Sequence, residues 1–392
     1  MRRLTLDYLR TEAGAGLLLP AAALVALGLA NSAYAGAYFG VLGRPEIVRV
    51  GPFAETLTIG GWVRALLMPI FFLVLGMQLK FELLRGELSN PRRLALPLLA
   101  ALGGLAGPAV IFLGFALAGS PRWSDWAAGS ATDGAAALAA LTVAGARVAP
   151  QLRMLLMSVA TVDNLAADVV AAAAQSAGLR LPLLAAALVV LAALAVLSRW
   201  RRAPFLFYAV GFALVWAVTL RSGLDPSLAG IACALTAPVG ARRPGQESTL
   251  KYFMESLHPY VAFAILPVFL LTTAGVPLHS LHPPALAAAA PIAVMLALSV
   301  GKPAGVFCAG CAALGLRWAR PPAGAAWEEL LAVALLCGIG LTVSYYVAGP
   351  AASAPIRGAV LIGSAAAAAA GFALLSWTGR DRPLAAASRR TS

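Results

Sequence analysis

Three acidic residues of this 392-residue chain stand well inside apolar stretches: Asp133, Asp163 and Asp168. If those stretches span a membrane, each carboxylate costs at least about 2.5 kcal/mol to insert, so its presence indicates a function. On a helix, Asn164 and Asp168 share one face about 6 Å apart along the axis, and Asp163 is rotated by about 100° from Asn164. Oxygen ligands of this kind hold either protons or a small monovalent cation. The cluster therefore offers the competition that exchange of a cation for protons requires.

Lys302 is the basic counterpart of these acids. The 29 basic residues include only three lysines, and Lys302 is the one inside an apolar run. A buried lysine can lose its proton near neutral pH, whereas arginine stays charged. We therefore predict a reversible ion pair between Asp163 and Lys302. The alternative is a static salt bridge that only makes membrane insertion tolerable.

The composition indicates the elements that must position these residues. Hydrophobic residues make up 61% of the chain and charged residues 11%, far from the roughly 25% charged residues of soluble domains. Runs long enough to cross a bilayer recur along the chain, and we predict an all-α polytopic membrane protein with about twelve spans. The predicted spans are 12–31, 63–84, 95–118, 123–143, 151–176, 182–198, 204–220, 223–238, 258–277, 284–314, 328–348 and 355–377. They form one integral membrane domain, 1–392, in which 378–392 is a short cytoplasmic tail.

The basic residues predict the orientation of these spans. With a cytoplasmic N-terminus, seven of the 29 basic residues fall on the outside and Lys302 lies within a span, which leaves 21 on the cytoplasmic side. Lys and Arg collect on cytoplasmic loops, so we predict that both termini of this multi-pass inner-membrane protein are cytoplasmic. The seven are Arg44, Arg49, Arg64, Arg122, Arg180, Arg221 and Arg357.

Glycines and hydroxyl residues interrupt the fourth and eleventh spans. The fourth contains Gly-Ser-Ala-Thr-Asp-Gly ending at Gly134, and the eleventh contains Cys-Gly-Ile-Gly-Leu-Thr with Gly338 and Gly340. Glycine weakens a helix, and hydroxyls satisfy the backbone groups that a break exposes. Two broken helices in corresponding positions indicate a transporter site built by inverted repeats, here spans three to five and ten to twelve. The alternative is that the small residues only permit close helix packing.

Asp133 and Lys302 are placed to compensate the half-helix ends at these breaks. Each end carries a partial charge of about half an electron unit. Thr132 and Asp133 lie directly in the fourth-span break.

Other functions have little support in the sequence. The net charge of +13 reports membrane topology, so no nucleic-acid partner is expected. We find no nucleophile elbow and no phosphate loop and expect neither enzymatic activity nor a cofactor. His258, at the predicted start of the ninth span beside Pro259, is expected to cap a helix.

At these residues the chain resembles the NhaA family of bacterial sodium/proton antiporters. The resemblance runs through most of the chain and includes residues 76–83, 131–133, 161–165, 222–230, 257–259, 274–276, 301–303 and 336–342. It implies inverted repeats with two discontinuous crossing helices, transported Na⁺ and H⁺ as the partners in the bilayer, and a possible homodimer. It also implies that Asp133 compensates the half-helix ends, that Asp163 pairs with Lys302, and that Thr132 lies near the cation path.

The departures from the family matter equally. The family has two adjacent aspartates where this chain has Asp163 and Asn164, and the second aspartate is the principal Na⁺ ligand and proton carrier. An amide can give an oxygen to Na⁺ but cannot carry a proton. Gln78 replaces a family glutamate, Asp225 replaces a histidine, and Asp168 stands where the family has an apolar residue.

Three hypotheses follow for a Na⁺ or Li⁺/proton antiporter that extrudes sodium and supports pH homeostasis. Asp168 takes over as the titrating carboxylate, or Asp163 and Lys302 run an exchange of altered stoichiometry or cation with Asn164 as a neutral ligand. In the third, the chain has lost sodium exchange and acts as a non-transporting sensor or membrane partner.

Overall fold

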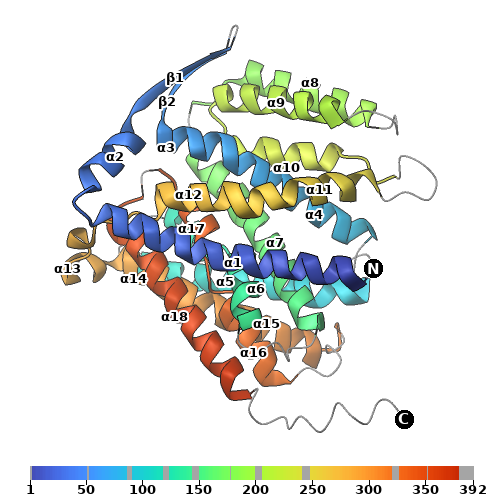
Figure 1. Ribbon diagram of the computed structural model, residues 1–392. Coiled ribbons are helices and arrows are strands. Elements are labelled where there is room, and N and C mark those ends of the chain that lie inside the picture. The colour runs from blue at the N-terminus through green and yellow to red at the C-terminus, as the bar shows by residue number, and fades with distance from the viewer. Residues whose placement is uncertain are drawn as a thin grey trace.

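The computed structural model describes residues 2–50, 53–85, 91–117, 123–143, 150–176, 178–198, 205–240, 248–319, 326–350 and 352–378. Helices dominate these residues, and most of them run roughly alongside one another (Figure 1). The predicted tail at 378–392 lies outside them except for Thr378.

The helices confirm the predicted all-α membrane fold. Each predicted span overlaps one helix or consecutive helical segments of the described chain. Single helices are α1 (Arg2–Ala30), α5 (Pro91–Leu117), α7 (Pro150–Gln175), α8 (Leu181–Leu197), α9 (Phe205–Ser222), α10 (Ser227–Thr236) and α18 (Ala354–Thr378). Composite spans are α3 (Ile59–Trp62), η1 (Val63–Leu67) and α4 (Met68–Arg85); α11 (Thr249–Tyr260), η4 (Val261–Ile265) and α12 (Leu266–Thr273); and α14 (Ala289–Leu296), η6 (Ala297–Gly301) and α15 (Lys302–Gly315).

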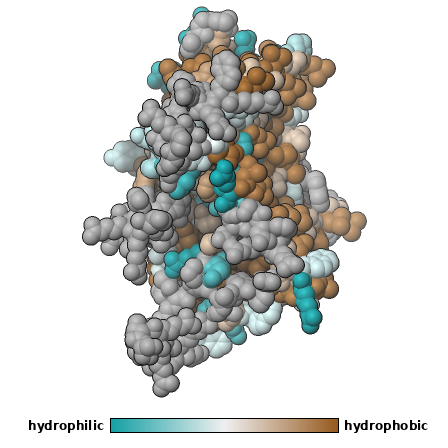
Figure 2. Space-filling view, turned by 90° about the vertical axis from the view of Figure 1, so that its right-hand side faces the viewer, coloured by the Kyte–Doolittle hydropathy of each residue, from teal (hydrophilic) through white to brown (hydrophobic). Residues whose placement is uncertain are grey.

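Length and apolar composition show that this is a multi-pass membrane protein. Six helices among the described residues, each with 24 to 27 residues, are long enough and apolar enough to cross a membrane. Helices α8, α9 and α10 are apolar but shorter. In a view turned by 90° from Figure 1, apolar residues cover a broad area of the described surface and hydrophilic ones are few (Figure 2).

Three composite helices contain a π-helical turn with the same local cause. The turns are η1, η4 and η6, and a proline follows each at the second position beyond its end: Pro69, Pro267 and Pro303. Proline cannot donate to the carbonyl four residues earlier, which here is the middle of the turn, and its ring clashes with that carbonyl. The helix therefore widens locally. In η1 the freed carbonyl of Ala65 instead accepts a hydrogen bond from the indole of Trp216, at 2.6 Å.

The connection after α1 contains regular structure that the sequence analysis did not address. Helix α2 (Ala35–Gly43) leads into an antiparallel hairpin of β1 (Pro45–Val50) and β2 (Phe53–Thr58). The hairpin projects from one end of the molecule beside α2 (Figure 1). Arg221 at the end of α9 forms an ion pair with Glu55 at 3.2 Å, and the Trp62 indole donates to the carbonyl of Glu46 at 3.0 Å. These contacts attach the hairpin to α9 and to α3.

The predicted start of the ninth span was wrong, and so was the predicted role of His258. The helix begins at Thr249, nine residues earlier, where the side chain of Ser248 accepts from the Lys251 amide at 3.1 Å. Ser248 is therefore the cap, and His258 lies inside the helix. The sequence around Lys251 and Glu255 is polar. A search for apolar runs therefore does not detect this first part of the helix. Likewise, the tenth span begins at Ala289, after a separate short helix, α13 (Pro283–Leu286).

Helices α5 and α15 cross through glycines that bring Lys302 close to α7. A Cβ atom built on Gly107 would overlap the carbonyl oxygen of Gly301, and one on Gly305 would overlap that of Gly103. Only residues without a side chain permit two backbones to approach so closely. Because Lys302 directly follows Gly301, this crossing sets the position of its side chain.

Gly107→Ala is expected to destabilise the protein by about 1 to 3 kcal/mol, because the added methyl group must push two backbones apart. Gly114→Ala on the same helix is the matched control, because a Cβ there meets no atom within 4 Å and alanine favours the helix. Thermal unfolding of the detergent-purified proteins measures both. Equal melting temperatures for the two variants would contradict the proposed role of the crossing.

Candidate ion-binding site

Two interrupted helices meet at their breaks in the interior of the protein. The first consists of η3 (Trp123–Gly129) and α6 (Gly134–Val143), and the second of α16 (Trp327–Leu336) and α17 (Thr342–Ala348). The amide of Asp133 donates to the carbonyl of Ile339 at 2.5 Å, which ties the two breaks together. A Cβ on Gly338 would overlap the carbonyl oxygen of Leu298 in η6. Gly338 and Gly340 lie within the second break, whereas Gly134 is the first residue of α6.

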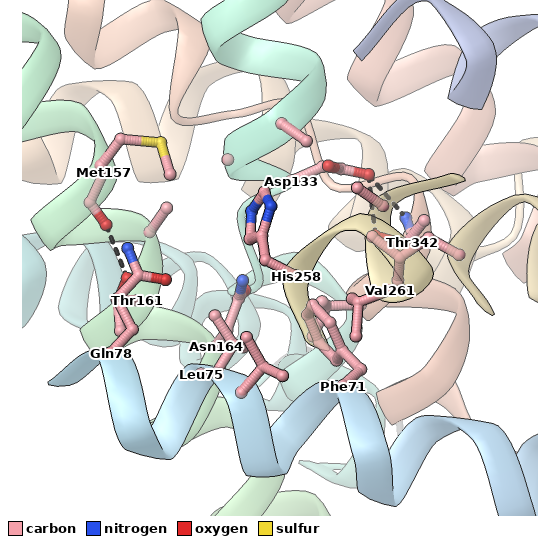
Figure 3. Close-up of a pocket in the computed structure, with 17 residues that line it drawn as sticks. Phe71, Leu75, Gln78, Asp133, Met157, Thr161, Asn164, His258, Val261 and Thr342 are labelled. Atoms are coloured by element: carbon pink, nitrogen blue, oxygen red, sulfur yellow. Dashed lines mark hydrogen bonds between the residues drawn. The ribbon is translucent and has the colours of Figure 1, made fainter. Parts of the chain in front are cut away.

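Asp133 caps the N-termini of two helices at once. Its Oδ2 accepts from the amide and the hydroxyl of Thr342 at 3.2 and 2.8 Å (Figure 3). Its Oδ1 accepts from the Ala136 amide at 3.2 Å. Thr342 begins α17, and Ala136 lies in the first turn of α6. A carboxylate satisfies the free amides of helix N-termini and compensates their partial positive charge.

Lys302 and Thr132 serve the opposite helix ends. The Lys302 ammonium donates to the carbonyl of Ser130, directly after η3. The hydroxyl of Thr132 lies 2.9 Å from the carbonyl of Cys337, directly after α16. Cations and donors are favourable at helix C-termini. The four half-helix ends therefore receive a carboxylate on the amide side and an ammonium and a hydroxyl on the carbonyl side.

Asp163 and Lys302 form an ion pair without solvent contact. Lys302 Nζ lies 3.0 Å from Asp163 Oδ2, and both side chains are 0% exposed. The Thr132 hydroxyl lies 3.2 Å from the same Oδ2, and Asp163 Oδ1 has no hydrogen-bond partner. A buried carboxylate with one oxygen unsatisfied and a single cation on the other is costly, and such a site favours an additional proton or cation.

Asn164 faces a cavity of about 70 Å³ beside this pair. Its Oδ1 accepts from the Thr132 amide at 2.9 Å. The cavity is also lined by Gln78 of α4, Asp133 and His258 (Figure 3). Along α7 it follows the N-terminal half from Met157 to Asn164, the residue next to Asp163, and neither Asp163 nor Lys302 lines it.

The structure places Asp168 apart from this cavity. Its Oδ1 accepts from the Ser227 hydroxyl at 3.0 Å, and its neighbours are Asp225 and Arg64. It is one helical turn from Asn164, as predicted, but this part of α7 meets other neighbours. Asp133, Asp163, Thr132, Asn164 and Lys302 thus come together around the breaks, and Asp168 belongs to a second polar cluster.

The sequence analysis missed several contacts of the site. Thr342 is the main partner of Asp133, and the backbone oxygens of Ser130 and Cys337 receive donors. Thr342, the threonine that follows the second break, was a signal for such a cap, since threonine favours helix ends. No comparable signal marks which carbonyl oxygens a break will expose.

A helical multi-pass protein with two discontinuous helices crossing over buried ionisable groups has the architecture of a secondary transporter. Residues 6–375 match the family described as Na⁺/H⁺ antiporter 1, and the chain belongs to that family. Na(+)/H(+) antiporter NhaA from Rhizorhabdus wittichii is 39% identical over 388 residues, which cover 97% of this chain and 100% of that protein. Na(+)/H(+) antiporter NhaA 2 from Shewanella denitrificans is 37% identical, covering 87% and 85%. Na(+)/H(+) antiporter NhaA 1 from Pseudomonas syringae pv. syringae is 39% identical, covering 94% of each.

Asp133→Ala is expected to lower the free energy of unfolding by about 2 kcal/mol, because each lost helix cap costs about 1 kcal/mol. Thermal unfolding in detergent measures the change. Glu328→Ala is the control: this acid also lies in the first turn of a helix, α16, but is exposed, and its removal is expected to cost a few tenths of a kcal/mol. A loss no larger than that of the control would show that Asp133 is not the shared cap.

Proposed function

We propose that this protein exports Na⁺, or Li⁺, in exchange for protons by alternating access, with Asp163 as the central cation ligand. The observation that carries this proposal is the buried Asp163–Lys302 pair, whose Asp163 Oδ1 has no partner. Membership of this family and the names of its relatives support transport over the alternative of a non-transporting sensor.

Competition between Na⁺ and Lys302 for the Asp163 carboxylate couples Na⁺ transport to proton transport. A Na⁺ ion bound by Asp163, with oxygens from Thr132 and Asn164, takes the carboxylate from Lys302. The ammonium then lacks its counter-ion in a dry interior, which favours release of its proton. When the proton returns, Lys302 rebinds Asp163 and displaces Na⁺. Na⁺ therefore binds the site when Lys302 has lost its proton, and the returning proton displaces Na⁺. This mutual exclusion couples the transport of the two ions.

Asn164 limits the central pair to one exchangeable proton. Its amide oxygen already accepts from the Thr132 amide in the present arrangement, and it has no acidic proton to lose. The pair of Asp163 and Lys302 therefore accounts for one proton per Na⁺ and moves no net charge by itself.

We further propose that the cavity beside Asn164 is the cytoplasmic access path. If the N-terminus is cytoplasmic, α7 begins on the cytoplasmic side, and the cavity follows its N-terminal half from Met157 to Asn164. His258 and Gln78 in this wall give polar contacts along the path. The proposal includes one membrane domain over 1–392 in the inner membrane, cytoplasmic termini, no cofactor and no enzymatic reaction. The family resemblance suggests a homodimer, which the mass of the purified protein in detergent would test.

Asp163→Asn is expected to abolish Na⁺-dependent proton flux, because the amide cannot neutralise a buried cation. The flux is measured as relief of a respiratory pH gradient in everted membrane vesicles upon addition of NaCl or LiCl. Glu328→Gln, an exposed acid outside the site, is the control and is expected to retain wild-type flux. Wild-type flux in Asp163→Asn would overturn the site assignment, and absence of flux in the wild-type protein with every alkali cation would overturn the proposed function.

Asp163→Asn and Lys302→Gln are each expected to destabilise the protein by about 3 kcal/mol, because each leaves one buried charge without its partner. The double variant is expected to cost less than the sum of the two single changes, since neither charge remains. Thermal unfolding of all four proteins completes the cycle. Additive losses would show that the two side chains do not interact in the folded protein.

A further inference from the structure

The second polar cluster surrounds Asp168, a residue that the central pair does not use. It joins α7 to the start of α10 through Ser227, to the α9–α10 connection through Asp225, to η1 through Arg64 and to α17 through Tyr346. Asp225, Arg64 and Tyr346 are the charged and titratable groups that face Asp168 from these elements.

The two carboxylates of this cluster have very different surroundings. Asp225 receives the Tyr346 hydroxyl at 2.5 Å, the Ser227 amide at 3.0 Å and the Arg64 guanidinium at 3.5 Å. Arg64 in turn donates to the Tyr346 carbonyl at 2.5 Å and lies 4.0 Å above the ring of that residue. The single cation of the cluster is thus engaged by Asp225 and Tyr346, and Asp225 has the contacts that an ionised carboxylate requires.

Asp168 has no such contacts. It is 1% exposed, its Oδ1 accepts only from the Ser227 hydroxyl, and its Oδ2 has no partner. One hydroxyl does not compensate a buried negative charge, least of all next to a second carboxylate. In this arrangement, a proton on Asp168 keeps the cluster neutral, with Asp225 and Arg64 as its only charged pair.

The position of the cluster suits proton access from the side opposite the cavity. The cavity reaches Asn164 along the N-terminal half of α7, and Asp168 lies one turn further toward the C-terminal end. The Arg64 and Asp225 side chains are 15% and 12% exposed, whereas Ser227 is fully buried. Ser227 donates hydrogen bonds to both carboxylates, from its amide to Asp225 and from its hydroxyl to Asp168. The polar contacts therefore run from a partly exposed pair to a buried acid.

We propose that Asp168 is a second proton carrier, which releases one proton for each Na⁺ bound at Asp163 and thereby replaces the carboxyl that Asn164 lacks. This inference rests on the proposed exchange function. Na⁺ at Asp163 and Asn164 lies about 6 to 7 Å from Asp168 along the helix. At an effective dielectric constant near 20, two unit charges at that distance change each other's binding by roughly 50-fold at most, because the positive charge that Lys302 loses acts in the opposite sense. A bound Na⁺ thus favours the ionised form of Asp168 and a returning proton disfavours Na⁺, although the two ions share no ligand.

The charge balance predicts the number of protons exchanged for each Na⁺. The central pair releases one proton per Na⁺, and Asp168 adds a second, so one cycle moves two protons inward for each Na⁺ outward. The wild-type exchanger therefore carries net charge and responds to membrane potential. Without the Asp168 carboxyl, the same cycle exchanges one proton for one Na⁺ and is electroneutral.

The test counts protons released per Na⁺ bound by the full-length protein in weakly buffered detergent solution, with Na⁺ binding measured by calorimetry. The expected count is two for the wild type and one for Asp168→Asn, an isosteric variant that can still accept from Ser227. Glu328→Gln, an exposed acid outside both polar clusters, is the control and is expected to keep two. Asp168→Glu restores a carboxyl and is also expected to keep two.

Two further measurements do not depend on how well Asp168→Asn folds. In proteoliposomes, a potassium–valinomycin potential is expected to drive exchange by the wild type. In infrared difference spectra of the wild type, addition of Na⁺ is expected to remove the band of a protonated carboxyl. One proton per Na⁺, no response to potential and no loss of that band in an active wild-type protein would overturn the role of Asp168 and leave the exchange function intact. An unchanged count of two in folded Asp168→Asn would also overturn it. Absence of Na⁺ binding and flux in the wild type would overturn the exchange function itself.

Discussion

The structure depends on the compensation of backbone groups where two helices are interrupted in the buried interior. Breaking two helices side by side leaves amides at two N-termini and carbonyls at two C-termini without helical partners, and such groups are costly when buried. Asp133 satisfies the amides of both α6 and α17, and Lys302 and Thr132 satisfy carbonyls at the other ends. The groups that permit the breaks thus include one member of the proposed transport pair, so stability and transport depend on the same lysine.

Several ordinary features of helix packing bring that lysine into place. Glycines let α5 and α15 approach until their backbones nearly touch, and the π-helical turn η6 ends directly before Lys302. Pro303 explains that turn, because it removes the amide that would have continued the α-helical ladder. The same relation of a proline to a π turn places Arg64 in η1, where it reaches Asp225 and Tyr346. A widened helical turn therefore contains Arg64 and another directly precedes Lys302.

The sequence predicted the spans and the central ion pair because both leave strong local signals. Apolar runs locate membrane helices, the two glycine and hydroxyl interruptions located the breaks, and an isolated lysine among many arginines singled out Lys302. The β1–β2 hairpin carries no comparable signal within a connection that faces the solvent. The polar first turns of α11 hid the true start of that helix and thus misplaced His258. For Asp168, helical spacing gave the correct face of α7 but not the residues that contact it. Asn164 on this face lines the cavity, whereas Asp168, one turn further along, contacts Ser227 at the start of α10.

The shared cap at Asp133 also governs the order in which the protein can be assembled. Asp133 and Thr342 are 209 residues apart in the chain, so α6 is synthesised and inserted long before α17 exists. Until then the carboxylate serves only its own helix, and the Asp133 amide and the Thr132 hydroxyl lack the carbonyls of Ile339 and Cys337 that they later meet. Completion of the crossing must therefore be a late event in biogenesis, in which the C-terminal repeat docks onto an N-terminal half that is already in the bilayer.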